Sequence, residues 1–172
     1  MTARDEQELN DSVDEITDAL LTASRLLLGI SARSIADVDE SITITQFRTL
    51  VLLSSRGPMN LATLAGHLDV QPSSTGRMVD RLVATGLIDR RPHPASRREI
   101  VVSLTNRGRN LVRRVTIRRR GHIARIVQDM PVAQRRGLVR ALAAFAASGG
   151  GEPAAVDALD SPPLSDQYTS RT

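Results

Sequence analysis

A polar segment over residues 71–81 carries the side chains best suited to contact a nucleic acid. Its short hydroxyl and amide groups and its arginines can form hydrogen bonds to base edges and to phosphates. Pro72 suits the first turn of a helix, which Gly86 would end. The candidate residues for contact with the major groove of duplex DNA are Gln71, Pro72, Ser73, Ser74, Arg77 and Arg81.

Two further arginines, Arg97 and Arg98, lie in a turn-rich segment between two candidate strands, residues 87–91 and 99–104. The second candidate strand alternates apolar and polar residues, a pattern typical of a half-buried strand. The two strands therefore predict a hairpin with an arginine-bearing loop at its tip. Such a loop can deliver a guanidinium into a narrow minor groove, where the negative potential of DNA is concentrated.

The elements that must position these residues are predicted from helical periodicity and capping signals. Residues 43–46 match a capping box that begins a helix, and the Gly-Pro pair at 57–58 ends it. Asn60 can cap a short helix over residues 61–68. A third helix over residues 72–85 completes a helix-turn-helix, whose last helix fits the major groove of DNA.

Three other segments carry apolar stripes. Residues 9–35 space their apolar side chains by three and four, as in a coiled-coil seam. A fifth helix, capped by Thr105 or Asn106, and a sixth helix together cover residues 105–147. Stripes of this length need a partner surface. Residues 148–172 are rich in Gly, Pro, Ser and Asp and lack periodicity, which predicts a disordered tail.

These patterns predict a mostly α chain with a small β-hairpin wing. Residues 43–104 are expected to form a winged helix-turn-helix domain. The first, fifth and sixth helices, over residues 9–35 and 105–147, are expected to form a helical dimerisation region. A two-fold protein of this kind would bind double-stranded DNA at an inverted repeat.

The charges of the chain are unevenly distributed, although its net charge is only +4. Residues 1–41 hold three arginines and ten acidic residues, whereas residues 71–125 hold fourteen arginines and three acidic residues. A concentrated basic region is the electrostatic pattern of a nucleic-acid-binding face. For the arginine run at residues 118–120, a solvated helix face or dimer-surface salt bridges to the acidic first helix are favoured over contact with DNA.

The sequence offers little for catalysis or metal binding. It has no cysteine, and its three histidines include no pair at metal-ligand spacing. No nucleophile stands with a base, and no glycine-rich phosphate loop is present. We expect no enzyme activity, no cofactor and no metal. The acidic N-terminus does not resemble a secretory signal, and no apolar run approaches the length of a membrane span, so a cytoplasmic protein without membrane contact is expected.

Four stretches together resemble the MarR family, the multiple-antibiotic-resistance type regulators. They are LATLAGHL at 61–68, RMVDRLVATGLIDR at 77–90, SRR at 96–98 and VSLTNRG at 102–108. The resemblance covers roughly residues 10–147. It implies an obligate homodimer built from the first, fifth and sixth helices. It also implies repression, often of the protein's own gene, that a small phenolic or anionic effector relieves.

Two departures from the family pattern bear on the site. The family wing usually carries Asp where this chain has His93 and Ser96. Such an Asp pairs with and orients the wing arginine, whereas Ser96 can accept a hydrogen bond but cannot neutralise a charge. Gln71 stands where the family often has Ser, so the capping of the third helix of the helix-turn-helix is expected to be weaker. Further phosphate contacts are expected from Asn60 and Arg107.

Two alternatives remain open at this point. The chain could be a winged-helix module for protein interaction that has lost operator binding, or it could bind RNA. RNA-binding modules usually stack unpaired bases on aromatic side chains. Aromatic residues make up only 2% of this chain, which disfavours RNA.

Overall fold

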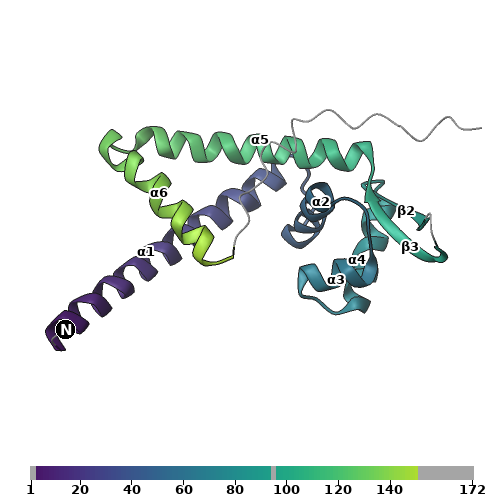
Figure 1. Ribbon diagram of the computed structural model, residues 1–172. Helices are drawn as coiled ribbons and strands as arrows, with labels where there is room; N and C mark the ends of the chain where they lie inside the picture. Colours follow the sequence, from purple (N-terminus) through teal and green to yellow (C-terminus); the bar gives the residue numbers. More distant parts are fainter. Residues whose placement is uncertain (1–2, 94–95, 151–172) are drawn as a thin grey trace, which may run out of the picture.

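The computed structural model places a small winged-helix body beside long outlying helices (Figure 1). It describes the backbone of residues 3–93 and 96–150, and the side chains of residues 12–92 and 99–150. Of the predicted tail, residues 151–172 lie outside the described part. The elements follow the order α1 (Ala3–Ala36), α2 (Ile44–Arg56), β1 (Met59–Asn60), α3 (Leu61–Leu68), α4 (Pro72–Ala84), β2 (Ile88–His93), β3 (Ser96–Leu104), α5 (Asn106–Asp129) and α6 (Val132–Ser148).

The strands form an antiparallel sheet in the order β1-β3-β2. The two-residue strand β1, which was not predicted, pairs Met59 with Val102 of β3. The hairpin of β2 and β3 is longer than predicted, so Arg97 and Arg98 belong to strand β3 and not to a loop. Because β2 lies at the edge of the sheet, Pro92 can continue the strand although it has no backbone N–H to donate.

The core of the body lies between α2, α3, α4 and the sheet. The helical spacing of residues 72–85 predicts Thr75, Met78, Val79 and Leu82 as inward positions of α4. This is confirmed, because Thr75, Val79 and Leu82 are buried and Met78 packs against the core. In α2 the helical spacing predicts Phe47, Leu50, Val51 and Leu53 or Ser54 as the apolar positions, and this prediction was partly wrong. Val51 is 38% exposed, while the unpredicted Thr49 is fully buried. The Thr49 hydroxyl donates to the carbonyl of Thr45, 3.0 Å away, which removes the cost of burying it.

The capping predictions are confirmed at the starts of α2, α3 and α5. Thr43 and Gln46 form a reciprocal capping box at the start of α2. The Asn60 side chain accepts a hydrogen bond from the backbone of Thr63, which caps α3. Thr105 caps α5 by accepting a hydrogen bond from the backbone N–H of Gly108, 3.0 Å away.

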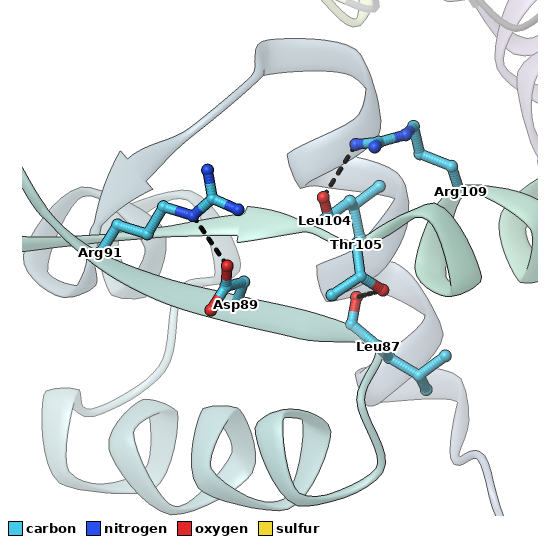
Figure 2. Close-up of polar contacts among 6 residues, drawn as sticks. All are labelled: Leu87, Asp89, Arg91, Leu104, Thr105 and Arg109. Atoms are coloured by element: carbon cyan, nitrogen blue, oxygen red, sulfur yellow. Dashed lines mark hydrogen bonds and ion pairs between the residues drawn. The ribbon is translucent and has the colours of Figure 1, made fainter.

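The start of α5 is fixed to the wing and to the end of α4 (Figure 2). The Thr105 hydroxyl donates to the carbonyl of Gly86 at 2.7 Å, and its backbone N–H donates to the carbonyl of Leu87 at 3.1 Å. Arg109 donates to the carbonyl of Leu104 at 2.8 Å. These bonds make the first turn of α5 continuous with the winged-helix body, so we expect the two to move together.

Gly108 is the residue on which this junction depends most. A Cβ at this position would collide with the backbone carbonyl of Leu87. We expect Gly108→Ala to lower the free energy of unfolding by about 2–3 kcal/mol, because neither backbone can move without breaking the junction. Thermal unfolding measures this loss. The control is Gly66→Ala in α3, where a Cβ meets no atom within 4 Å. It should raise stability by up to about 1 kcal/mol. Equal effects of the two substitutions would contradict the prediction.

The helices α1, α5 and α6 expose their apolar side chains. From residue 12 to residue 29 every residue of α1 is exposed except Leu20, which is half-buried. Helix α1 meets α5 only near its end, where Ile30, Ser34 and Ile35 are buried and Asp37 follows with an ion pair to Arg118. No residue of α6 is buried. The large exposed apolar residues on these helices include Val13, Ile16, Leu21, Leu26, Leu28, Ile117, Val132, Val139, Leu142 and Phe145.

The exposed stretch of α1 corrects one expectation from the sequence. Residues Ser12–Ala36 are long enough and apolar enough, by length and composition alone, to cross a membrane. The prediction that no segment approaches that length was therefore wrong. The acidic residues of α1 are concentrated in its first half, so the later residues carry few charges and the stretch is apolar enough to meet this criterion.

Candidate nucleic-acid interface

Helix α4 presents a polar face at its start. The buried Thr75, Val79 and Leu82 lie on one side of the helix, so its 3.6-residue period turns the polar residues outward. Pro72 occupies the first turn, and Gln71 at the N-cap makes no side-chain capping bond, as expected. The residues predicted for the major groove are all exposed, namely Gln71, Pro72, Ser73, Ser74, Arg77 and Arg81.

An open hollow of about 250 Å³ separates this face of α4 from the start of α2. Arg77 and Arg81 lie at its α4 side, and neither makes an ion pair or a side-chain hydrogen bond with the residues that the structure describes. The opposite wall is rigid, because Thr43 and Gln46 bond each other's backbone at 3.2 and 2.8 Å. Two guanidinium groups without an acidic partner among the described residues, at the edge of this hollow, form a site suited to a phosphate group.

The wing lies beside α4, at the end of the molecule opposite the N-terminal end of α1 (Figure 1). The backbone of Arg97 and Arg98 belongs to β3, and their side chains lie outside the described residues. Neither residue is therefore placed relative to the exposed face of α4 beyond its position in the strand.

Two acid–arginine pairs occur at the base of the wing among the described residues, and neither was predicted from the sequence. Arg90 of β2 forms an ion pair with Asp80 of α4, at 2.8 Å. Arg91 forms one with Asp89 of the same strand, also at 2.8 Å. The hydrogen bond from Arg91 lowers the pKa of the Asp89 carboxyl below its ordinary value. The i, i+2 spacing of Asp89 and Arg91 could have revealed their pairing, since it places both on one face of a strand.

Of the two residues predicted for further phosphate contacts, Asn60 is half-buried and hydrogen-bonded, whereas Arg107 is exposed. The Asn60 side chain is half-buried; it accepts from the backbone of Thr63 and donates to the carboxylate of Glu99. Its polar atoms are engaged in holding α3 and β3 together, so we do not assign it a phosphate contact. Arg107 is exposed in the first turn of α5, close to the junction with the wing.

Outside this face, the structure offers little other chemistry. Within residues 12–92 and 99–150, no group of three or more His, Cys, Asp or Glu side chains could hold a metal ion. Arg118, the first residue of the arginine run, pairs with Asp37 at 3.7 Å. This pair lies within one chain and joins α5 to the residue after α1; the prediction of a solvated helix face or dimer-surface salt bridges for the run stays a prediction.

Comparison with known proteins gives consistent matches. The model of the MarR family matches residues 42–100. The chain is 30% identical over 101 residues to the HTH-type transcriptional repressor Mb2911 of Mycobacterium bovis, covering 59% of this chain and 73% of that protein. The crystal structure of RV1404 from Mycobacterium tuberculosis is similar over 83% of this chain and 97% of that one, with 68% identity and a TM-score of 0.76.

The match to other curated relatives is shorter. The HTH-type regulator ML2140 of Mycobacterium leprae is 33% identical over 72 residues, which is 42% of this chain and 50% of that protein. The chain thus spans about half the length of such relatives. The residues that match the family model, 42–100, hold α2, α3, α4, β2 and the first part of β3.

Proposed function

Because the chain belongs to the MarR family and is a DNA-binding transcriptional regulator, we propose that it acts as a homodimeric repressor that binds a palindromic operator. The observation that supports this proposal most is the exposed start of α4 beside the wing, with two arginines that have no ion-pair partner among the described residues. In this proposal α4 enters the major groove, and its first turn contacts base edges through Gln71, Ser73 and Ser74.

Arg77 and Arg81 are proposed to bind a backbone phosphate in the hollow between α2 and α4. The phosphate would lie within reach of both guanidinium groups and of the exposed Thr45 hydroxyl. Contacts of this kind set the register of the helix on the duplex and carry no sequence information of their own. Arg107 is proposed to add a phosphate contact next to the wing.

The exposed apolar faces of α1, α5 and α6 support the dimer. Monomeric soluble proteins rarely expose contiguous apolar patches of this extent, and a helix with no buried residue, such as α6, is not stable without a partner. A second copy of the chain supplies a matching set of apolar faces. The two copies of α4 would then lie about 34–36 Å apart, which is one turn of the duplex.

Release of the operator is proposed to follow binding of a small phenolic or anionic effector. Such a ligand acts only if it binds one spacing of the two α4 helices better than the other. The rigid junction of α5 with the winged-helix body gives a direct mechanical route, because a shift of α5 at the dimer interface would move α4 with it. A regulator of this kind acts in the cytoplasm and needs no catalytic activity of its own.

Selection from a pool of random duplexes tests the proposal and separates it from the two alternatives. The expected result is enrichment of an inverted repeat, bound more tightly than an RNA duplex of the same sequence. Enrichment of no DNA sequence would favour a protein-interaction module. Preference for RNA would favour an RNA-binding module.

The wing is tested by replacing Arg97 and Arg98 together with alanine. We expect weaker binding to the selected duplex, and a plot of log affinity against log salt that is shallower by about 0.9 for each phosphate that the variant no longer neutralises. Fluorescence anisotropy at several salt concentrations measures both quantities. Unchanged affinity in the double variant would show that these arginines do not contact DNA.

A further inference from the structure

We propose that Arg91 is a further DNA-contact residue, which binds a backbone phosphate next to the wing, and that Asp89 positions it. This inference rests on the proposed function, since it names additional residues of the same interface. Neither residue was among the candidates from the sequence. The basis of the inference is the geometry of their ion pair and its place on the hairpin (Figure 2).

The pair lies on the outer face of the hairpin. Residues of β2 alternate between two faces, and Ile88 on the inner face is buried. Asp89 and Arg91 therefore share the opposite face, where their partners in β3 are Ser103 and Val101. The Arg91 side chain is 74% exposed, so it is free to meet a ligand from solvent.

The contact between the two side chains leaves most of the arginine available. The Nε of Arg91 donates to Oδ2 of Asp89 at 2.8 Å. The two terminal Nη groups make no hydrogen bond within the described part of the chain. These groups are the donors that bind a phosphate bidentately. Because Nε is held, the guanidinium is oriented before DNA arrives, which reduces the side-chain entropy lost on binding.

The neighbouring pair of Arg90 and Asp80 differs in a way that supports this assignment. Arg90 lies on the inner side of β2, its side chain is only 34% exposed, and its pair connects β2 to α4. That pair fixes the wing to the helix. Asp89 and Arg91 belong to one strand, two residues apart, so their pair connects no two elements of the fold. An exposed pair within one strand contributes little to stability.

The charge of Asp89 determines whether its removal should raise or lower the affinity for DNA. The carboxylate of Asp89 is charged at neutral pH, as an Asp carboxyl ordinarily is, and the hydrogen bond from Arg91 lowers its pKa further. A negative charge close to DNA repels phosphates, so Asp89 lowers the affinity for DNA unless its positioning of Arg91 outweighs this repulsion. If Asp89 positions Arg91, its removal weakens DNA binding in the wild-type chain. If it does not, its removal strengthens binding, because a repulsive charge is removed and Arg91 is freed.

The experiment is a double-mutant cycle of Asp89→Ala and Arg91→Ala, measured by anisotropy on the selected duplex and on a random duplex. We expect Arg91→Ala to weaken both affinities about tenfold and to reduce the salt slope by about 0.9 per protomer. We expect Asp89→Ala to weaken binding about threefold when Arg91 is present and to strengthen it when Arg91 is absent. Asp89→Asn, whose side-chain carbonyl can still accept from Nε, should keep most of the affinity.

Arg140→Ala on α6 is the control for removal of one arginine far from the wing. Sedimentation must show that this variant is still a dimer, and it should then leave the salt slope unchanged. Stronger binding of Asp89→Ala in the presence of Arg91 would overturn the positioning role. An unchanged affinity and salt slope in Arg91→Ala would overturn the contact itself. Absence of duplex binding by the wild-type chain would instead overturn the proposed function, so the two failures are distinguishable.

Discussion

Replacing Arg77 and Arg81 together by alanine is expected to weaken binding to the operator about a hundredfold or more. Both side chains lie at the hollow beside α4 and have no acidic partner in the described part of the chain. A charge-assisted hydrogen bond contributes about 1.5–3 kcal/mol, so the removal of two such bonds per protomer gives an effect of this size. Anisotropy on the selected duplex and on a random duplex measures it.

The matched control for this double variant is Arg77→Lys with Arg81→Lys. The lysines keep both charges but cannot form the planar, bidentate contact of a guanidinium. We expect them to restore most of the binding to random DNA and only part of the binding to the operator. Thermal unfolding should be unchanged in both double variants, because the two arginines are exposed and unpaired within the described residues. A decrease of less than threefold in the affinity of the alanine variant would contradict the phosphate site.

A second large effect is expected at the apolar surface of α6. Leu142→Glu combined with Phe145→Glu should convert the dimer into monomers, because the interface would have to bury two carboxylates per protomer without partners. Their side chains are 48% and 58% exposed in the single chain, and no residue of α6 belongs to the core, so the winged-helix body of the monomer should still fold. Operator affinity should fall by more than a factor of about a hundred, since each monomer can contact only one half-site.

The control for the α6 variant keeps the same positions apolar. Leu142→Met combined with Phe145→Leu should remain dimeric, because volume and hydrophobicity change little. Sedimentation equilibrium measures the state of assembly, and circular dichroism measures the helical content. A glutamate variant that remains dimeric at the concentrations where the wild-type chain is dimeric would show that α6 does not take part in the interface.

The helices of the body could be predicted because their signals are local. The capping box of Thr43 and Gln46, the cap of Asn60 and the cap of Thr105 each act within four residues. Helix α4 and its buried face could both be predicted, because its apolar residues recur at helical spacing. The exposed polar start of α4 followed directly from that face.

The strands and the ion pairs depend on contacts between distant residues, which local patterns do not contain. Strand β1 has only two residues and exists because Met59 meets Val102 across the sheet. The turn residues around Pro92 indicated a loop, but pairing at the sheet edge extends both strands toward the tip. The pair of Asp80 and Arg90 joins a helix to a strand, so only the folded chain brings those charges together.

The central claim is that the start of α4 and the wing bind one and the same duplex. Hydroxyl-radical footprinting of the selected duplex with the wild-type chain and with the Arg97→Ala, Arg98→Ala variant tests it most directly. We predict two protected half-sites about one duplex turn apart, each flanked by a minor-groove protection that the variant loses while the central protections remain. A footprint identical in the two proteins, or one without two-fold symmetry, would contradict the account.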